Sequence, residues 1–295
     1  MIKELLNKIK DHITKRKNVY VSIICALCIS ASCIITYNES LPTISDENGI
    51  PVPIIMYHSV LKSPKKQTKY IVTPTQLEND LLWLKNNGYT TVFISDLIDY
   101  VYNNVNLPEK PVVITFDDGY YNNLTYLYPL LIKYGMKASI SLVGSYSEEF
   151  SKTLDLNPAY AHLTWDNVKQ MQASGLVEFL NHSYDMHSND VRKGSSIIKG
   201  EDINKYKALF TSDVMKLQQM LSDNCAITPN AYTYPFGHIC NEAEEILKEL
   251  GFLATLSCYE KVNYITKDPN CLYQLRRFNR SSNLSTEGFM KKIID

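Results

Sequence analysis

The feature that most constrains the fold is an alternation, from about residue 51 onward, of short apolar runs with stretches of helical periodicity. The runs are apolar at consecutive positions, as in VPIIMYH at 52–58 and PVVITF at 111–116. Such strands, separated by helices, are typical of a parallel sheet that helices cover. About seven strand–helix units favour an α/β fold closed as a barrel over an open doubly wound sheet. Strands are expected at 52–58, 90–94, 111–116, 137–143, 176–182, 231–236 and 252–257.

Helix-boundary residues support this alternation. Thr73 to Gln76 form a capping box with Pro74 at the first helical position. Gly88 is placed to end that helix, as Gly135 is for a later one. We therefore expect one α/β domain over residues 51–295, with helices from Pro74 to about Gly88, through Leu97 and Tyr100, and near 122–134, 165–174, 201–222, 241–250 and 285–294.

The N-terminal segment predicts a membrane anchor. Residues 18–38 carry no charge and are mostly apolar, and as a helix they are long enough to cross ~30 Å of hydrocarbon. The basic residues that precede them outnumber the acidic ones, which places residues 1–17 in the cytoplasm and the domain outside. A buried core helix fits poorly, because a polar linker at 39–50 follows directly. Ser30–Ser32 and Cys33 loosely resemble cleavage and lipidation sites, but we favour an uncleaved anchor.

Composition and the absence of two sequence motifs argue against nucleic acid and nucleotides as binding partners. A formal net charge of -1 gives no basic field for nucleic acid. No GxGxxG or GxxxxGK[ST] motif follows an early strand, so a nucleotide is not expected. An exported domain permits disulfides, and its four cysteines allow three full pairings. These cysteines are Cys225, Cys240, Cys258 and Cys271.

Polar residues collect where the expected strands end, and the carboxyl ends of parallel strands meet at one edge. His58, Asp117-Asp118 and His182 each follow an apolar run, and His187 is five residues beyond His182. Alone, Asp-Asp-Gly is a common turn and two nearby histidines arise by chance. Together, one Asp and two His form a set that holds a divalent ion with open positions. The second Asp is then available as a general base.

Three motifs in this set resemble the polysaccharide deacetylase family, carbohydrate esterase family four. They are TFDDGY at 115–120, HSYDMH at 182–187 and YPFG at 234–237. The opening PIIMYHSV and the histidine spacing are most similar to the branch that includes poly-β-1,6-N-acetylglucosamine deacetylases. The resemblance runs from about Pro51 to the last helix and implies a distorted (β/α) barrel.

The resemblance also implies roles for residues. Asp117 matches the general base, and Asp118, His182 and His187 match the metal ligands. Ser183 matches the hydroxyl that steadies the loop between the histidines. Tyr234, Pro235 and Phe236 match a groove wall that binds substrate, in which the Phe236 backbone N–H helps to hold the oxyanion. Of the tyrosines near these motifs, we expect Tyr234 to offer its ring to a sugar.

The chain also departs from the family pattern. Residues 230–233 lack the usual arginine, Asp-x-x-x-Trp has no clear match, and arginines stand where a histidine often serves as general acid. His58 is our candidate to donate that proton or to bind substrate, with a hydrogen-bonded structural histidine as the alternative. Arg277 is assigned to the substrate-binding site, where it either orients Asp117 as a bidentate pair or is a surface charge. His162 and His238 are given no role.

We therefore expect a single-pass membrane protein whose extracellular domain removes N-acetyl groups from an N-acetylglucosamine-containing polysaccharide, either exopolysaccharide or peptidoglycan. The expected cofactor is one divalent ion, with zinc favoured by imidazole and carboxylate ligands. Two alternatives stay open: an O-acetyl esterase that acts on a wall glycan, and a catalytically silent glycan-binding module.

Overall fold

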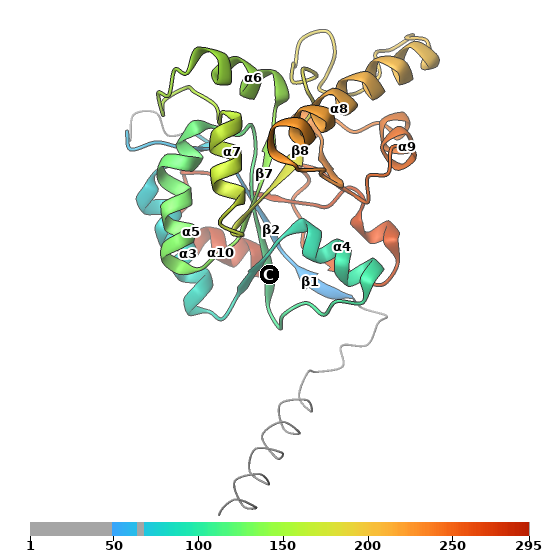
Figure 1. The fold of residues 1–295 in the computed structure, drawn as a ribbon. Coiled ribbons are helices and arrows are strands. Elements are labelled where there is room, and N and C mark those ends of the chain that lie inside the picture. Colours follow the sequence, from blue (N-terminus) through green and yellow to red (C-terminus); the bar gives the residue numbers. More distant parts are fainter. Residues whose placement is uncertain (1–48, 64–67, 295) are drawn as a thin grey trace, which may run out of the picture. The chain divides into compact units, whose positions relative to one another are not determined.

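A curled parallel sheet forms the centre of the domain in the computed structural model (Figure 1). Seven strands follow in the order β10-β9-β8-β7-β6-β2-β12, and β5 pairs with the first half of β6. Every pairing in this sheet is parallel. The strands are β2 (Ile54–Tyr57), β5 (Thr90–Val92), β6 (Pro111–Phe116), β7 (Ala138–Leu142), β8 (Val177–Asn181), β9 (Ala231–Thr233), β10 (Ala254–Leu256) and β12 (Phe278–Asn279).

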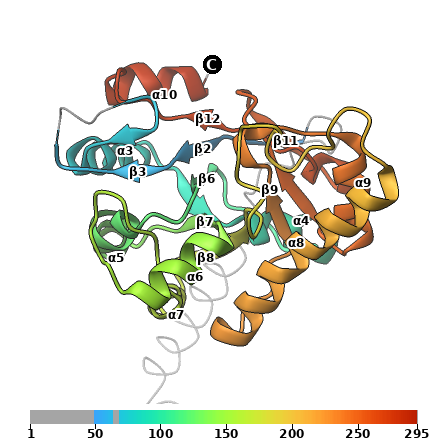
Figure 2. The same ribbon diagram turned by 90° about the horizontal axis from the view of Figure 1, so that it is seen from above.

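Helices pack around this sheet, as Figure 2 shows from above. The helices are α3 (Pro74–Asn86), α4 (Ile94–Asn103), α5 (Tyr128–Tyr134), α6 (Gly144–Thr153), α7 (Trp165–Gln172), α8 (Ile203–Cys225), α9 (Asn241–Glu249) and α10 (Thr286–Ile294). Shorter helical turns are η2 (Asn123–Leu127), η3 (Pro235–Gly237) and η4 (Pro269–Leu272). Two small strand pairs complete the fold: antiparallel β1 (Ile50–Val52) with β11 (Asn263–Ile265), and parallel β3 (Ser59–Val60) with β4 (Ile71–Val72).

The central strands are buried on both faces. All residues of β2 and β6 are buried. Along β2, Ile54 packs into one apolar cluster and Ile55 into another, and Val113 and Ile114 of β6 alternate in the same way. Because each face meets its own core, the strands are apolar at consecutive positions.

The start of α3 shows how closely local sequence fixes an element. The Thr73 hydroxyl accepts a hydrogen bond from the Gln76 amide at 3.1 Å, and the Gln76 side chain accepts one from the Thr73 amide at 3.0 Å. This is the capping box that the sequence predicted, with Pro74 at the first helical position.

The predicted α/β fold with about seven parallel strands is confirmed, but the sheet curls as a half-barrel rather than a full barrel. In the described chain, the edge strands β10 and β12 do not pair with each other. A single parallel bridge, Leu256 to Leu275, links β10 to the segment before β12. The expected closure is therefore only partial.

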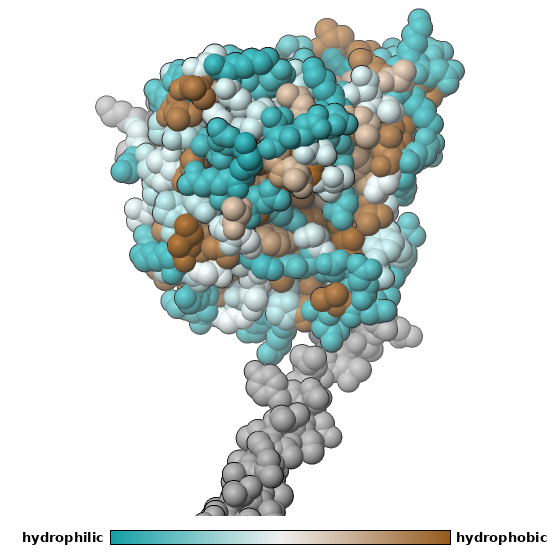
Figure 3. All heavy atoms as spheres, viewed as in Figure 1, coloured by the Kyte–Doolittle hydropathy of each residue, from teal (hydrophilic) through white to brown (hydrophobic). Residues whose placement is uncertain are grey.

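The structure describes residues 49–63 and 68–294, which fall within one unit, Ser45–Asp295. The predicted cytoplasmic tail, the anchor at 18–38 and nearly all of the linker lie outside the described residues. Within the described ranges, no helix combines the length and the apolar character that a membrane span requires. Hydrophilic side chains cover most of the domain face in Figure 3, and the apolar ones gather in separate spots.

Candidate active site

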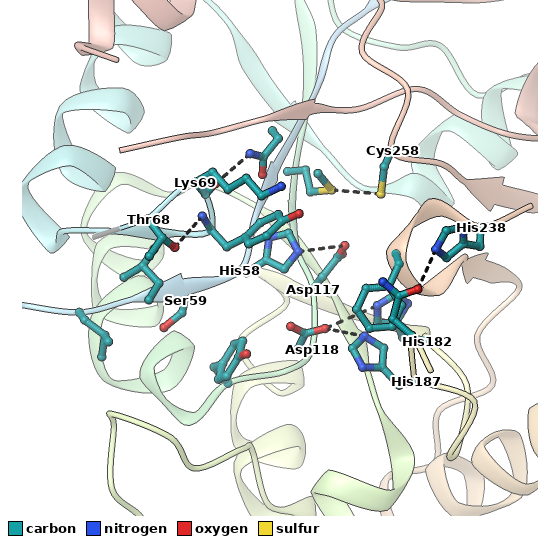
Figure 4. A pocket seen from close by; sticks show the side chains of 18 of the residues that line it. His58, Ser59, Thr68, Lys69, Asp117, Asp118, His182, His187, His238 and Cys258 are labelled. Atoms are coloured by element: carbon teal, nitrogen blue, oxygen red, sulfur yellow. Dashed lines mark hydrogen bonds and ion pairs between the residues drawn. The ribbon is translucent and has the colours of Figure 1, made fainter. Parts of the chain in front are cut away.

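A cavity of about 710 Å³ lies at the carboxyl ends of the central strands (Figure 4). His58 follows β2, Asp117 and Asp118 follow β6, and His182 follows β8. These four residues and His187 all line the cavity. The fold thus gathers residues that are up to 129 positions apart in the chain, the separation of His58 and His187. Parallel pairing explains this, because all these strand ends face the same edge.

Asp118, His182 and His187 form a compact cluster. Asp118 Oδ1 lies 3.1 Å from His187 Nε2 and 3.6 Å from His182 Nε2. One ligand atom from each residue lies within 4.8 Å of the others. Burial raises the pKa of the Asp118 carboxyl, but its close contacts with the His182 and His187 imidazoles outweigh this and leave the pKa well below its usual value. The cluster therefore keeps a carboxylate in a buried position.

The orientation of His182 is set by its second ring nitrogen. His182 Nδ1 lies 2.7 Å from the carbonyl oxygen of Thr233. A carbonyl can only accept, so Nδ1 donates, and Nε2 of the neutral ring carries the lone pair on the side of the cluster. This arrangement is typical of a metal-binding histidine, whose other N–H is held by an acceptor.

Three residues at the site have a backbone conformation that side chains disfavour. Asp118, Ser183 and Phe236 have φ values of 69°, 70° and 57°. Such strain persists where surrounding contacts hold it, and it is concentrated at functional sites. At Asp118 one of these contacts is known: His162 Nδ1 donates to its carbonyl at 2.8 Å. Glycine suits the next position, because Gly119 also has a positive φ, of 64°, and a Cβ there would push against the Leu142 side chain.

Asp117 is paired with a buried arginine. Arg277 Nη1 and Nη2 donate to the two carboxylate oxygens at 2.7 and 2.9 Å. The remaining N–H groups donate to the Ser257 carbonyl at 2.8 Å, to the Thr115 hydroxyl at 3.3 Å and toward the Cys258 sulfur at 3.8 Å. Burial raises the pKa of Asp117, but the Arg277 charge and nearby imidazoles outweigh it, so the pKa is lowered.

This geometry decides between the two interpretations of Arg277. Its side chain is fully buried and does not line the cavity. It is therefore neither a surface charge nor a residue that can touch substrate. Arg277 stands behind Asp117 and fixes the plane of its carboxylate.

His58 lines the cavity beside Asp117. Its Nε2 lies 3.9 Å from Asp117 Oδ2, and burial lowers its pKa. Its Nδ1 is buried and has no hydrogen-bond partner among the described residues. The structure therefore does not support the alternative that His58 is a structural histidine held by hydrogen bonds. The ring instead packs against that of Tyr70, with centroids 4.8 Å apart.

The Tyr234–Phe236 motif is divided between core and cavity. Tyr234 is fully buried and packs at 5.4 Å against the Tyr232 ring, so it offers no face to a sugar in this structure. Pro235 is buried, and Phe236 is 46% exposed with its ring 4.6 Å from that of His187. Because η3 begins at Pro235, the Phe236 amide belongs to a first turn that lacks intrahelical partners. Phe236 is the member of this motif that lines the cavity.

The structure adds residues that sequence patterns did not indicate. Lys69 and Tyr70 enter the cavity from the connection between β3 and β4, where no periodicity singles them out. His162 holds Asp118 from outside the cavity, and His238 lines the cavity and contacts the Asn189 side chain at 3.2 Å. Neither histidine lies in a motif that sequence reasoning used. Cys258 also lines the cavity, and it and the other three cysteines of the domain are free thiols.

Comparisons with known proteins follow the same segments. The family model described as polysaccharide deacetylase matches residues 104–255, which is just over half of the 295 residues. The match includes Asp117, Asp118, His182 and His187, whereas His58 and Arg277 lie outside it.

Among curated proteins, the chain is 25% identical over 265 residues to the poly-beta-1,6-N-acetyl-D-glucosamine N-deacetylase of Escherichia coli K12. That alignment covers 80% of this chain but only 39% of the relative. The protein of the same name from Staphylococcus aureus MRSA252 is 26% identical over 212 residues, which are 72% of this chain and 68% of the relative.

Two solved structures share the fold. The de-N-acetylase from Aggregatibacter actinomycetemcomitans aligns with a TM-score of 0.71 at 22% identity, over 82% of this chain and 99% of that one. IcaB from Ammonifex degensii aligns with a TM-score of 0.68 at 22% identity, over 84% and 97%. At this identity the likeness concerns the fold alone.

Proposed function

Because the chain belongs to the polysaccharide deacetylase family, we propose that it is a metal-dependent hydrolase that removes N-acetyl groups from a polymer of the poly-β-1,6-N-acetylglucosamine type. The observation that carries the proposal is the cluster of Asp118, His182 and His187 beside the arginine-paired Asp117 in one cavity. The names of the E. coli and S. aureus relatives support the choice of polymer.

The donor set fits a divalent ion. Two imidazole nitrogens and one carboxylate oxygen are typical ligands of zinc in hydrolytic sites, and they leave positions open for water and substrate. The Thr233 carbonyl already fixes the His182 tautomer that ligation needs. An ion held by Asp118, His182 and His187 would polarise the acetyl carbonyl and make a water molecule more acidic.

Asp117 is placed to take the proton of the attacking water. Its lowered pKa keeps it ionised, and Arg277 uses both oxygens without occupying every lone pair. The carboxylate therefore stays able to accept a proton on the side that faces the cavity. Water adds to the acetyl carbon, the C–N bond then breaks, and acetate and a sugar amine leave.

His58 is placed to deliver a proton to the leaving nitrogen. It lies across from Asp117 at 3.9 Å, and its lowered pKa makes its proton easier to give up. The Phe236 amide supplies a donor for the developing oxyanion, because its turn leaves that N–H unpaired within the helix. The strained φ of Phe236 sets the direction of this amide.

Location is a separate part of the proposal. The uncharged run at 18–38 and the basic residues before it support a single-pass anchor with the domain outside the cell. An extracellular domain would meet its polymer substrate there.

The experiment that tests the function is acetate release from β-1,6-linked N-acetylglucosamine oligomers by the purified chain, with metal content measured on the same sample. We expect about one divalent ion per chain and loss of turnover with a chelator. His182→Ala and His187→Ala should each lose the ion, with His238→Ala as the matched control, because His238 lies outside the cluster. Metal binding by both cluster variants at the parental level would contradict the assignment. Release from O-acetylated but not N-acetylated glycans would favour the esterase alternative.

A further inference from the structure

A lysine lines the cavity on the side of His58. The Lys69 ammonium sits 4.8 Å from the centroid of the Tyr70 ring, and that ring lies 4.8 Å from the ring of His58. Figure 4 shows the Lys69 side chain on the side of the cavity where His58 lies. Within the described part of the chain, Lys69 has no acidic partner. Its charge is therefore uncompensated beside the reacting groups.

The acids of the cavity are already engaged. Asp117 and Asp118 are the acidic residues among the described side chains that line it. Arg277 donates to both oxygens of Asp117, and the imidazoles of His182 and His187 face Asp118. No described carboxylate at the cavity is left to pair with a cationic sugar.

Tyr70 gives this corner of the cavity a face for a sugar. Tyr70 is 44% exposed, although its ring packs against that of His58. A sugar unit next to the reacting one can lie on such an aromatic face, and it would then be close to the Lys69 ammonium. Asn279 donates to the Lys69 backbone carbonyl at 2.8 Å, which holds this residue in place.

The reaction itself changes the charge of the polymer. Each hydrolysis converts a neutral acetamide into a primary amine, which is protonated in mildly acidic solution. We propose that Lys69 and Tyr70 form a subsite for the neighbouring sugar, and that Lys69 selects an N-acetylated unit there and disfavours a free amine. The inference rests on the proposed deacetylase function. It predicts acetyl removal at dispersed positions rather than in contiguous blocks.

The test compares two β-1,6-linked pentamers with the full chain: one fully acetylated, and one with a single free amine next to the unit that is cut. Acetate release is followed at pH 6 and low ionic strength. For like charges a few ångströms apart in a solvent-exposed site, we expect roughly fivefold higher kcat/KM for the acetylated pentamer. Added salt should reduce this ratio, because it screens exposed charges.

Three variants isolate the charge. Lys69→Gln should bring the ratio toward one, and Lys69→Glu should invert it in favour of the amine. Lys62→Gln is the matched control and should keep the parental ratio, because the Lys62 ammonium lies over Tyr126 rather than in the cavity. Only the ratio within each variant is compared, so a general loss of activity does not affect the result.

Each outcome bears on one proposal. Equal kcat/KM for the two pentamers, a parental ratio in Lys69→Gln, or an equal change in Lys62→Gln would overturn the role of Lys69. Failure of the proposed function looks different, because the parent would then release no acetate from the fully acetylated pentamer. In that case, calorimetric affinities of the two pentamers for the parent and Lys69→Gln still decide whether Lys69 discriminates.

Discussion

Replacement of Arg277 tests whether orientation of Asp117 limits the rate. Arg277→Lys keeps a positive charge but lacks the planar fork that donates in parallel to the two carboxylate oxygens, which now accept at 2.7 and 2.9 Å. A hydrogen bond to a charged group contributes about 1.5–3 kcal/mol. If this orientation is needed in the transition state, kcat/KM should fall about ten- to hundredfold. Arg277→Met should also cost about 3–5 kcal/mol of stability, because it leaves Asp117 buried and unpaired.

The pH dependence gives a second readout. In the folded protein the pKa of Asp117 is lowered, so its ionised form stabilises the fold above the unfolded pKa, and that stability is lost as pH falls through the folded pKa. Removing the guanidinium raises this pKa, so the acidic limb of the rate profile should move to higher pH in Arg277→Met.

The assay is acetate release from pH 4 to 8, with denaturant unfolding measured on the same preparations. Arg276→Lys is the matched control, because Arg276 is the exposed neighbour of Arg277. An unchanged acidic limb together with parental kcat/KM in both Arg277 variants would refute the reasoning.

Three further outcomes are expected. Asp117→Asn should retain metal but lose ~10²–10⁴-fold in rate, whereas Asp118→Asn should lose both metal and rate. If Asp118→Asn is inactive but keeps its metal while Asp117→Asn stays active, the two roles are reversed. Asp80→Ala should lower the unfolding free energy by about 3–5 kcal/mol in urea, because it strands the fully buried Arg280, which now donates at 2.7 Å. Protease added to intact cells should reach the domain but not residues 1–17; protection of the domain would contradict the predicted topology.

The parts of the fold that were predictable are those with a local cause. Burial on both faces makes β2 and β6 apolar at nearly every position, and the Thr73 capping box marks the start of α3 by itself. Sheet closure has no such signature. It depends on whether residues near Leu275 pair with β10, which only the folded chain decides.

The candidate site divides in the same way. The gathering of Asp118, His182 and His187 was predictable because these residues follow strands, and parallel strands end at one edge. The sequence left two interpretations of Arg277 open, because the sequence pattern does not show whether an arginine is buried or exposed. Tyr234 and Phe236 differ in exposure because the chain turns at Phe236, where φ is 57°. Neither the turn nor the burial is visible in the motif itself.

The last strand joins several parts of the site. Arg277 precedes β12 and holds Asp117, and Arg280 follows it and pairs with Asp80 of α3. Between them, Asn279 donates to the Lys69 carbonyl. β12 itself pairs with β2, the strand that His58 follows. One short segment therefore positions the proposed base and the proposed selectivity residue, and the buried ion pair to α3 fixes that segment. A shift of β12 would be expected to disturb rate and selectivity together.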